Sequence, residues 1–125
     1  MARSLSAAAY SPGEVLDVTI QYERFGIETP LVVGYIEELP PGWTYLGIVD
    51  NGGAPPGVAP EVNAQGALEF AWITVPSMPG YFTYQVQAPV DAAGLAHFSG
   101  YGLYRFTGAQ IETGVIETYI PQARL

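Results

Sequence analysis

The chain has 125 residues and a formal net charge of −8 at pH 7, and its 15 Gly and 11 Pro are too many for a helical bundle. An apolar content of 49% excludes a disordered tail, so we expect one folded domain over residues 1–125. The absence of Cys and Lys excludes disulfides, thiolate metal sites, Schiff bases and Lys–Asn isopeptide bonds, and the scarcity of Arg argues against binding to nucleic acid or to anionic membranes.

Segments with the two-residue period of a β-strand recur along the chain, and Gly and Pro separate them. In 15–22 and 82–87, apolar residues alternate with polar ones, which is typical of a strand with one buried face. The segments with strand character are 15–22, 31–39, 43–49, 68–72, 82–87, 96–106 and 110–120. They predict an all-β fold, namely a single antiparallel immunoglobulin-like β-sandwich of about seven to eight strands with Greek-key connections.

Two regions depart from this regular spacing. Residues 50–66 are too rich in Gly and Pro for a regular element, so we expect a long loop there. Residues 96–120 are expected to form a terminal hairpin around Thr107-Gly108. Gly100 and Gly102 share one face of its first strand, and we expect them to leave room for a bulky aromatic side chain or to mark a β-bulge.

The sequence leaves the location of the protein open. No apolar run approaches the roughly 20 residues that a membrane-crossing helix needs, so no membrane insertion is expected. Residues 1–9 lack the apolar stretch of a signal peptide. The chain is therefore interpreted either as cytosolic or as a mature domain whose export signal has been removed.

A series of short motifs follows a fixed order along residues 3–106. The motifs are Arg3, Tyr10-Ser11-Pro12-Gly13, Val15 to Ile20, the corner from Glu37 to Trp43, Phe70-Ala71-Trp72, Thr83 to Pro89, and Phe98-Ser99-Gly100. In this order they resemble the immunoglobulin-like accessory and adhesion modules of bacterial extracellular multidomain proteins. The resemblance implies an extracellular or cell-surface location and a non-catalytic role. The chain departs from it in the long loop at 50–66 and in the extra strand after Thr107.

Few residues are candidates for catalysis. His97 is the single histidine, and the alternation places it on the face opposite Phe98, so we interpret it as a solvated surface residue. Glu37 and Glu38 are adjacent on a predicted strand and face opposite sides, so they cannot act as one acid–base pair. We expect no catalytic residue and no cofactor.

Glu37, Glu38, Pro40, Gly42 and Trp43 are instead interpreted as a structural corner. Of the two carboxylates, one is expected to face inward and to accept backbone N–H bonds that fix this corner. A buried carboxylate needs such partners, because its desolvation is costly.

A calcium site would need several converging oxygen ligands. Asp50, Asn51 and Glu61 in the long loop are the candidates. The chain has only three Asp and no Asp-x-Asp-x-Asp spacing, so we expect no metal site.

The candidate interaction residues are aromatic or lie in the last predicted strand. Tyr81 and Tyr101 are expected to be exposed, because their apolar neighbours claim the inward positions. The last strand is long and apolar, and its candidates are Val115, Ile116, Tyr119 and Ile120. It either completes its own sheet or pairs with a neighbouring subunit.

We predict a non-catalytic structural or interaction module that acts as a spacer, in adhesion or in self-assembly. Its expected partners are other protein domains or identical subunits. The alternative is a carbohydrate-binding module appended to a secreted enzyme, which would use a row of exposed aromatic side chains on a polysaccharide. An enzyme is disfavoured, because the chain has one His, no Lys and no Cys from which to build a nucleophile–base pair.

Overall fold

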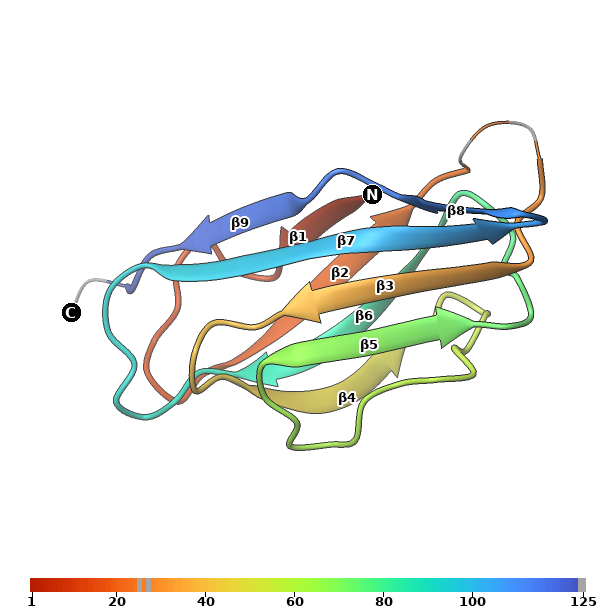
Figure 1. The fold of residues 1–125 in the computed structure, drawn as a ribbon. Helices are drawn as coiled ribbons and strands as arrows, with labels where there is room; N and C mark the ends of the chain where they lie inside the picture. The colour runs from red at the N-terminus through yellow and green to blue at the C-terminus, as the bar shows by residue number, and fades with distance from the viewer. Residues whose placement is uncertain (25, 27, 124–125) are drawn as a thin grey trace.

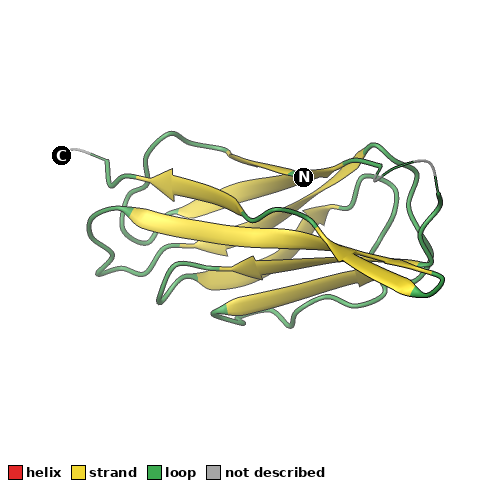
Figure 2. Ribbon diagram, turned by 45° about the horizontal axis from the view of Figure 1, so that its top comes forward, coloured by secondary structure: helices red, strands yellow, loops and turns green. Residues whose placement is uncertain are grey.

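The computed structural model describes residues 1–24, 26 and 28–123, and in these it contains nine β-strands and no helix. The strands are β1 (Ala2–Leu5), β2 (Val15–Tyr22), β3 (Val32–Glu38), β4 (Thr44–Asp50), β5 (Ala67–Trp72), β6 (Gly80–Gln87), β7 (Ala96–Phe106), β8 (Ala109–Glu112) and β9 (Ile116–Ile120). One sheet has the order β1-β2-β6-β4, and the other has the order β5-β3-β7, with both β8 and β9 paired to β7 (Figure 1). The two sheets pack face to face as a sandwich (Figure 2).

The connectivity is that of an immunoglobulin-like domain. From β2 to β7 the chain changes sheet at every connection. When β5 is set aside, the orders β1-β2-β6-β4 and β3-β7-β8/β9 correspond to the ABED and CFG sheets of immunoglobulin domains. β5 adds an edge strand beside β3. The predicted fold class is therefore confirmed.

The structure has more strands than predicted because a short strand forms at the N-terminal end and the last predicted strand is divided in two. β1 is not among the predicted segments, since its four residues carry no apolar alternation. The predicted terminal hairpin forms, but its second strand is divided into β8 and β9 at residues 113–115. At the break, the Thr113 hydroxyl accepts the backbone N–H of Gly102 at 2.7 Å. Both pieces complete the protein's own sheet.

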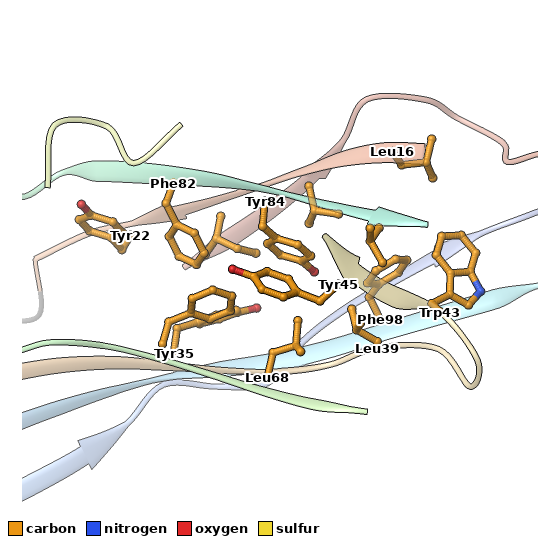
Figure 3. Packing of buried hydrophobic residues seen from close by; sticks show 14 of the residues in the cluster. Leu16, Tyr22, Tyr35, Leu39, Trp43, Tyr45, Leu68, Phe82, Tyr84 and Phe98 are labelled. Carbon is orange, nitrogen blue, oxygen red and sulfur yellow. The ribbon is translucent and has the colours of Figure 1, made fainter. Parts of the chain in front are cut away.

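The core lies between the sheets and is mainly aromatic (Figure 3). In β2, β5 and β6, the residues that alternate inward are buried, as the two-residue period predicts. Phe70 lies 4.8 Å from Phe82 and 5.9 Å from Tyr84 between ring centroids. Trp72 is 1% exposed, which confirms its predicted place in the core. Burial of such side chains contributes roughly 1.5–3 kcal/mol each, so this core stabilises the fold without disulfides.

The loop between β4 and β5 covers residues 51–66 and is held to the sandwich by hydrogen bonds. The backbone N–H of Tyr45 donates to Ala64 O at 2.9 Å, and Tyr45 O accepts the N–H of Asn63 at 2.7 Å. The indole N–H of Trp72 donates to Ala54 O at 2.8 Å. The predicted long loop is therefore fixed to its own sheets at several points along its course.

Candidate functional site

Among the residues that the structure describes, Glu37 is the only charged residue that is buried as a whole, with an exposed fraction of 0%. β3 places it there, because Val33, Tyr35 and Glu37 alternate toward the core while Glu38 faces solvent. An unpaired carboxylate at this depth would cost several kcal/mol of stability. The partners of Glu37 therefore decide whether β3 is stable in this position.

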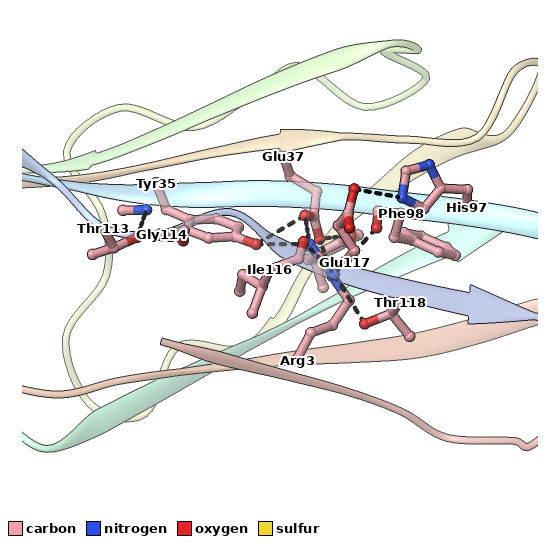
Figure 4. A network of polar contacts seen from close by, with 12 residues as sticks. Arg3, Tyr35, Glu37, His97, Phe98, Thr113, Gly114, Ile116, Glu117 and Thr118 are labelled. Atoms are coloured by element: carbon pink, nitrogen blue, oxygen red, sulfur yellow. Dashed lines mark hydrogen bonds and ion pairs between the residues drawn. The ribbon is translucent and has the colours of Figure 1, made fainter.

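Arg3 on β1 supplies the counter-charge (Figure 4). Its guanidinium donates through Nε to Glu37 Oε2 at 3.0 Å and through Nη2 to Glu37 Oε1. Both side chains are completely buried. A two-pronged contact of this kind is among the stronger hydrogen-bonded pairs in proteins. It joins β1 of one sheet to β3 of the other.

The other N–H groups of Arg3 reach two more strands. Nη1 donates to Phe98 O at 3.4 Å on β7. It also donates to Ile116 O at 3.2 Å and to Thr118 Oγ1 at 3.0 Å on β9. One side chain from the first strand thus binds three strands of the opposite sheet.

Tyr35 and Tyr84 complete the hydrogen bonding of the carboxylate. The Tyr84 hydroxyl donates to Glu37 Oε2 at 2.6 Å. The Tyr35 hydroxyl donates to Glu37 Oε1 at 2.9 Å and accepts Arg3 Nη2–H at 2.9 Å. Each carboxylate oxygen therefore accepts two hydrogen bonds, which compensates its loss of water. We refer to Arg3, Tyr35, Glu37 and Tyr84 as the buried polar cluster.

The cluster keeps the protons on Arg3, Tyr35 and Tyr84. Burial disfavours the charged form of Arg3, but the hydrogen bond and negative charge of Glu37 outweigh it, so the pKa of Arg3 lies above its ordinary value. Burial, followed by the charge of Glu37, raises the pKa of both Tyr35 and Tyr84 well above 10.0. Both hydroxyls therefore keep the proton that they donate.

Two glycines make room around the cluster. Across the β3–β7 pairing, Gly100 lies opposite Glu37 and Gly102 lies opposite Tyr35. A Cβ at Gly100 would collide with the Tyr35 hydroxyl and would lie 2.5 Å from Glu37 Oε1. At Gly100 the space is taken by the buried polar cluster, which includes the aromatic Tyr35, whereas at Gly102 it is taken by Met1 and not by an aromatic side chain.

The cluster acts as an electrostatic cross-link, because its charged side chains have no surface that a substrate could reach. Glu37 faces inward as expected, but its hydrogen bonds come from side chains and not from the backbone N–H groups of the corner. The sequence pointed to a buried ion pair only through an inward-facing Glu in a chain with four cationic side chains. Which cation would pair with it depended on an N-terminal strand that the pattern did not predict.

Pro40, Gly42 and Trp43 form the turn between β3 and β4. The N–H of Trp43 donates to Pro40 O at 3.1 Å, and Gly42 has a φ of 81°, which favours glycine. The Trp43 ring packs edge-on against Tyr10 and Phe98 at centroid distances of 5.0 and 5.4 Å. The predicted corner is therefore closed by a backbone bond and anchored by an aromatic ring.

The calcium candidates do not converge on one point. Asp50 accepts the N–H of Gly52 at 2.9 Å, and Asn51 accepts the N–H of Gly53 at 2.8 Å, so both side chains cap their own turn. Glu61 lies exposed farther along the loop. No three Asp, Glu or His side chains in the described residues are grouped as metal ligands.

The candidates in the last strand have different environments. Val115 is exposed between β8 and β9, Ile116 is half-buried against the core, and Ile120 is 1% exposed inside it. Tyr119 is exposed and its ring stacks on His97 with centroids 4.4 Å apart. His97 Nε2 lies 3.6 Å from Glu117 Oε1. Only Val115 and Tyr119 therefore offer a largely exposed side chain.

The candidate tyrosines lie on opposite sides of the sandwich. Tyr81 is 40% exposed on β6 of the four-stranded sheet, and its hydroxyl donates to Asp50 Oδ2 at 2.9 Å. This hydrogen bond raises the pKa of Tyr81. Tyr101 is half-buried on β7 of the other sheet. Four other aromatic side chains are buried and offer no ring to a sugar, namely Trp43, Trp72, Tyr45 and Tyr104.

The outer faces of the two sheets differ in chemistry. Across β2 and β6, polar side chains pair with one another, as Thr19 does with Thr83 at 2.8 Å and Gln85 with Asp17 at 3.0 Å. The outer face of the other sheet carries a group of apolar side chains that we call the Tyr101 face. It consists of Val32, Ile36, Ala71, Tyr101 and Leu103.

Two hollows lie near these surfaces. On the Tyr101 face, Gly34 leaves a shallow hollow of about 160 Å³ between Ile36 and Leu103, with Glu69 and Arg105 at its rim. A larger hollow of about 620 Å³ lies at one end of the sandwich. Its lining includes Tyr22, Pro55, Pro79 and Tyr81.

Comparisons with known proteins agree on the fold. No protein-family model and no curated protein matches the chain. Among solved structures, it is similar to a cohesin module of a family 33 glycoside hydrolase from Clostridium perfringens, with a TM-score of 0.72 at 9% identity over 96% of this chain and 94% of that one. It is also similar to domains D2 and D3 of the major pilin SpaD from Corynebacterium diphtheriae, with a TM-score of 0.66 at 10% identity over 94% of this chain. The chain spans half the length of that pilin fragment.

A collagen-binding domain from a Staphylococcus aureus adhesin is similar too, with a TM-score of 0.56 at 9% identity over 94% of this chain and 99% of that one. At these identities the likeness establishes the fold. The chain is therefore an immunoglobulin-like domain of the kind found in bacterial pilin, adhesin and cohesin modules. Within the described residues, no helix has the length and apolarity to cross a membrane.

The buried ion pair predicts a large stability effect. Arg3→Met leaves the Glu37 carboxylate buried without its cation and should lower the free energy of unfolding by roughly 3–5 kcal/mol. The double variant Arg3→Met/Glu37→Met should recover a large part of this loss. Urea unfolding followed by the fluorescence of the buried tryptophans measures both. Arg105→Met, on the exposed end of β7, is the control and should shift stability by no more than about 0.5 kcal/mol. A double variant as unstable as the single one would contradict the role of the unpaired carboxylate.

The raised tyrosine pKa values predict a loss of stability in alkali. A tyrosine whose pKa is higher in the folded state contributes fully below its unfolded pKa of 10.0 and less as the pH rises above it. The chain has no Lys or Cys but it has nine tyrosines, so the comparison with Tyr84→Phe is what isolates the contribution of this one residue. The unfolding free energy should therefore fall between pH 10 and 12. In Tyr84→Phe the fall should be shallower by about 1.4 kcal/mol per pH unit, as measured by urea unfolding at each pH. Equal slopes in the two proteins would show that Tyr84 ionises normally when folded.

Proposed function

We propose that this chain is a non-catalytic interaction module of a bacterial extracellular or cell-surface protein, and that it binds another protein through the Tyr101 face. The observation that carries the proposal is the difference between the two outer faces. On one face polar side chains of β2 and β6 pair with each other beside the exposed Val15 and Tyr81, whereas the other face groups half-buried apolar side chains around the hollow at Gly34. An aromatic and aliphatic centre is typical of the surface that proteins bury against a partner.

The rim of this face adds specificity. Glu69 and Arg105 border the hollow and carry opposite charges. Charges at the edge of an interface orient a partner more than they strengthen its binding. A partner that places an apolar side chain over Gly34 and polar groups toward this rim would match the face.

Three observations support a module without catalysis. The charged pair is enclosed and holds strands together, His97 stacks on Tyr119, and the side chains of Asp50 and Asn51 cap their own turns. The similar structures include a collagen-binding domain, a pilin and a cohesin module. These support an adhesive or structural role outside the cell, with a protein such as collagen or an identical subunit as the partner. β9 pairs with β7 along one of its two edges, and the exposed side chain that it would contribute is Tyr119.

The proposal is tested on the full chain with two protein probes. Binding to immobilised collagen tests adhesion, and sedimentation of the chain alone from micromolar to millimolar concentration tests self-association. Tyr101→Ser should weaken whichever association is found at least tenfold, because an aromatic side chain at the centre of an interface contributes about 2 kcal/mol or more.

Two further variants locate the binding face. Gly34→Ala should also weaken binding, since its Cβ would make only ordinary contacts at 3.5 Å with Leu103 and Phe70 and would fill part of the hollow. Thr83→Ala, on the opposite outer face, is the matched control and should bind like the unchanged chain. Binding that Tyr101→Ser and Gly34→Ala leave intact would place the partner elsewhere.

A second candidate function is carbohydrate binding, and the large hollow at the end of the sandwich favours it. Tyr81 lines this hollow with a partly exposed ring, and its hydroxyl is fixed by Asp50. An aromatic ring beside a fixed carboxylate offers stacking and hydrogen bonds to a sugar. The single ring distinguishes this surface from an extended row of aromatics.

Retention on insoluble polysaccharides tests this second function. Retention of the unchanged chain, with loss in Tyr81→Ser and none in Tyr101→Ser, is the expected result for a sugar site at the hollow. A chain that washes through every polysaccharide column, or that is retained equally in both variants, would contradict it.

A further inference from the structure

The two ends of the chain run side by side in the same direction. After β1, Tyr10 forms a parallel bridge with Gln122, which follows β9. The N–H of Tyr10 donates to Pro121 O at 3.0 Å, and the N–H of Ala123 donates to Tyr10 O at 2.7 Å. The N-terminus lies at the start of β1, and the arrows of β1 and β9 point in the same direction (Figure 1). A pull on the two ends therefore drags these neighbouring segments in opposite directions along their length.

Such a pull loads many hydrogen bonds at once. β1 pairs with β2 from Ala2 to Leu5, and a force along β1 strains all of these bonds together instead of opening them one at a time. The same holds for the bridge at Tyr10 and Gln122. This geometry resists sliding of β1 along β2, but the paired segment is only four residues long.

Arg3 lies within this paired segment, and its side chain adds a second attachment, which we call the Arg3 anchor. Its side chain passes between the sheets and makes six hydrogen bonds, to Glu37, Tyr35, Phe98, Ile116 and Thr118. β1 cannot slide toward its own N-terminus unless the guanidinium leaves its buried carboxylate. That step leaves the Glu37 carboxylate in the core without its cation, which raises the free-energy barrier to unfolding. It also separates β1 from β9, the strand that carries the opposing force.

We propose that the Arg3 anchor makes this domain a tension-bearing link, in which one buried guanidinium cross-links the first and last strands against a pull between the two ends of the chain. The chain has no Cys and no Lys for a covalent cross-link between side chains, so a non-covalent anchor fills that place. The inference rests on the proposed function in one respect, because tension reaches the domain only when it is a module joined to other parts at both ends.

Single-molecule pulling on the full chain tests the anchor. Because the chain has no Cys, handles attach only at cysteines appended before Met1 and after Leu125. At one fixed force, Arg3→Met should shorten the folded lifetime on the order of 100-fold. By the conversion of about 1.4 kcal/mol per factor of ten, this is less than the cost of breaking a buried pair. A lifetime equal to that of the unchanged chain would overturn the proposal.

The matched control is Leu68→Ala on β5. Leu68 is fully buried, and its truncation costs roughly 2–5 kcal/mol at equilibrium, similar to the loss expected for Arg3→Met. Since β5 lies at the far edge of the sheet from β9, the lifetime under terminal load should fall much less than in Arg3→Met. Equal shortening in two variants of equal equilibrium stability would mean that Arg3 is no more than a stabilising residue.

A second pulling direction separates the anchor from general stability. Cysteines at the exposed positions Glu61 and Thr107 apply force through the long loop and the β7–β8 turn, without passing through β1. The effect of Arg3→Met should then shrink severalfold. The same ratio of lifetimes in both directions would contradict a directional anchor.

Thr118→Val keeps the proposal testable if Arg3→Met does not fold. It leaves the Arg3–Glu37 pair intact and removes one of the two hydrogen bonds from Arg3 to β9, while the one to Ile116 O remains. We expect an equilibrium stability close to that of the unchanged chain and a lifetime under terminal load that is several times shorter. No change in lifetime would show that the hydrogen bond to Thr118 does not carry force, which would contradict its part in the anchor. Because these measurements involve no ligand, their outcome is independent of the binding tests on the Tyr101 face.

Discussion

A guanidinium and a carboxylate that are both excluded from water must stay together, and this constraint ties the ends of the chain to its centre. Arg3 lies on the short first strand, whereas Glu37 lies on a central strand of the opposite sheet. Tyr35 and Tyr84 supply the remaining donors to the carboxylate, so residues from both sheets share one set of hydrogen bonds. Loss of any member leaves the others with unsatisfied polar groups in a low-dielectric interior, which couples the placement of β1 to the integrity of the core.

The same constraint explains the features around the cluster. Gly100 lacks a side chain because the Tyr35 hydroxyl and the Glu37 carboxylate occupy the space that a Cβ would need. Thr118 and the carbonyl of Ile116 bring β9 to the guanidinium, which fixes the second piece of the divided terminal strand beside β7. The Arg3–Glu37 pair is therefore directed inward and holds the two sheets together.

The fold itself is shared with bacterial pilin, adhesin and cohesin modules at about a tenth of identical residues. Such divergence is possible because a β-sandwich requires a pattern of alternating burial more than particular residues. Two features of this chain underlie the proposals made above: the buried polar cluster, and the group of half-buried apolar side chains on the Tyr101 face. The first supports the proposed role under tension, and the second supports the proposed binding face.

The sequence by itself determined the all-β class, the seven segments with strand character and the inward residues of β2, β5 and β6, because a strand's two-residue period directly reports which face is buried. It also placed the long loop and showed that Glu37 and Glu38 face opposite ways. Only the tertiary structure decided that Arg3 pairs with Glu37, since residues 34 positions apart meet through sheet packing that no local pattern encodes. It also decided that Ile120 is buried and Tyr119 exposed, and that Tyr81 and Tyr101 lie on opposite faces, because these depend on which sheet each strand joins.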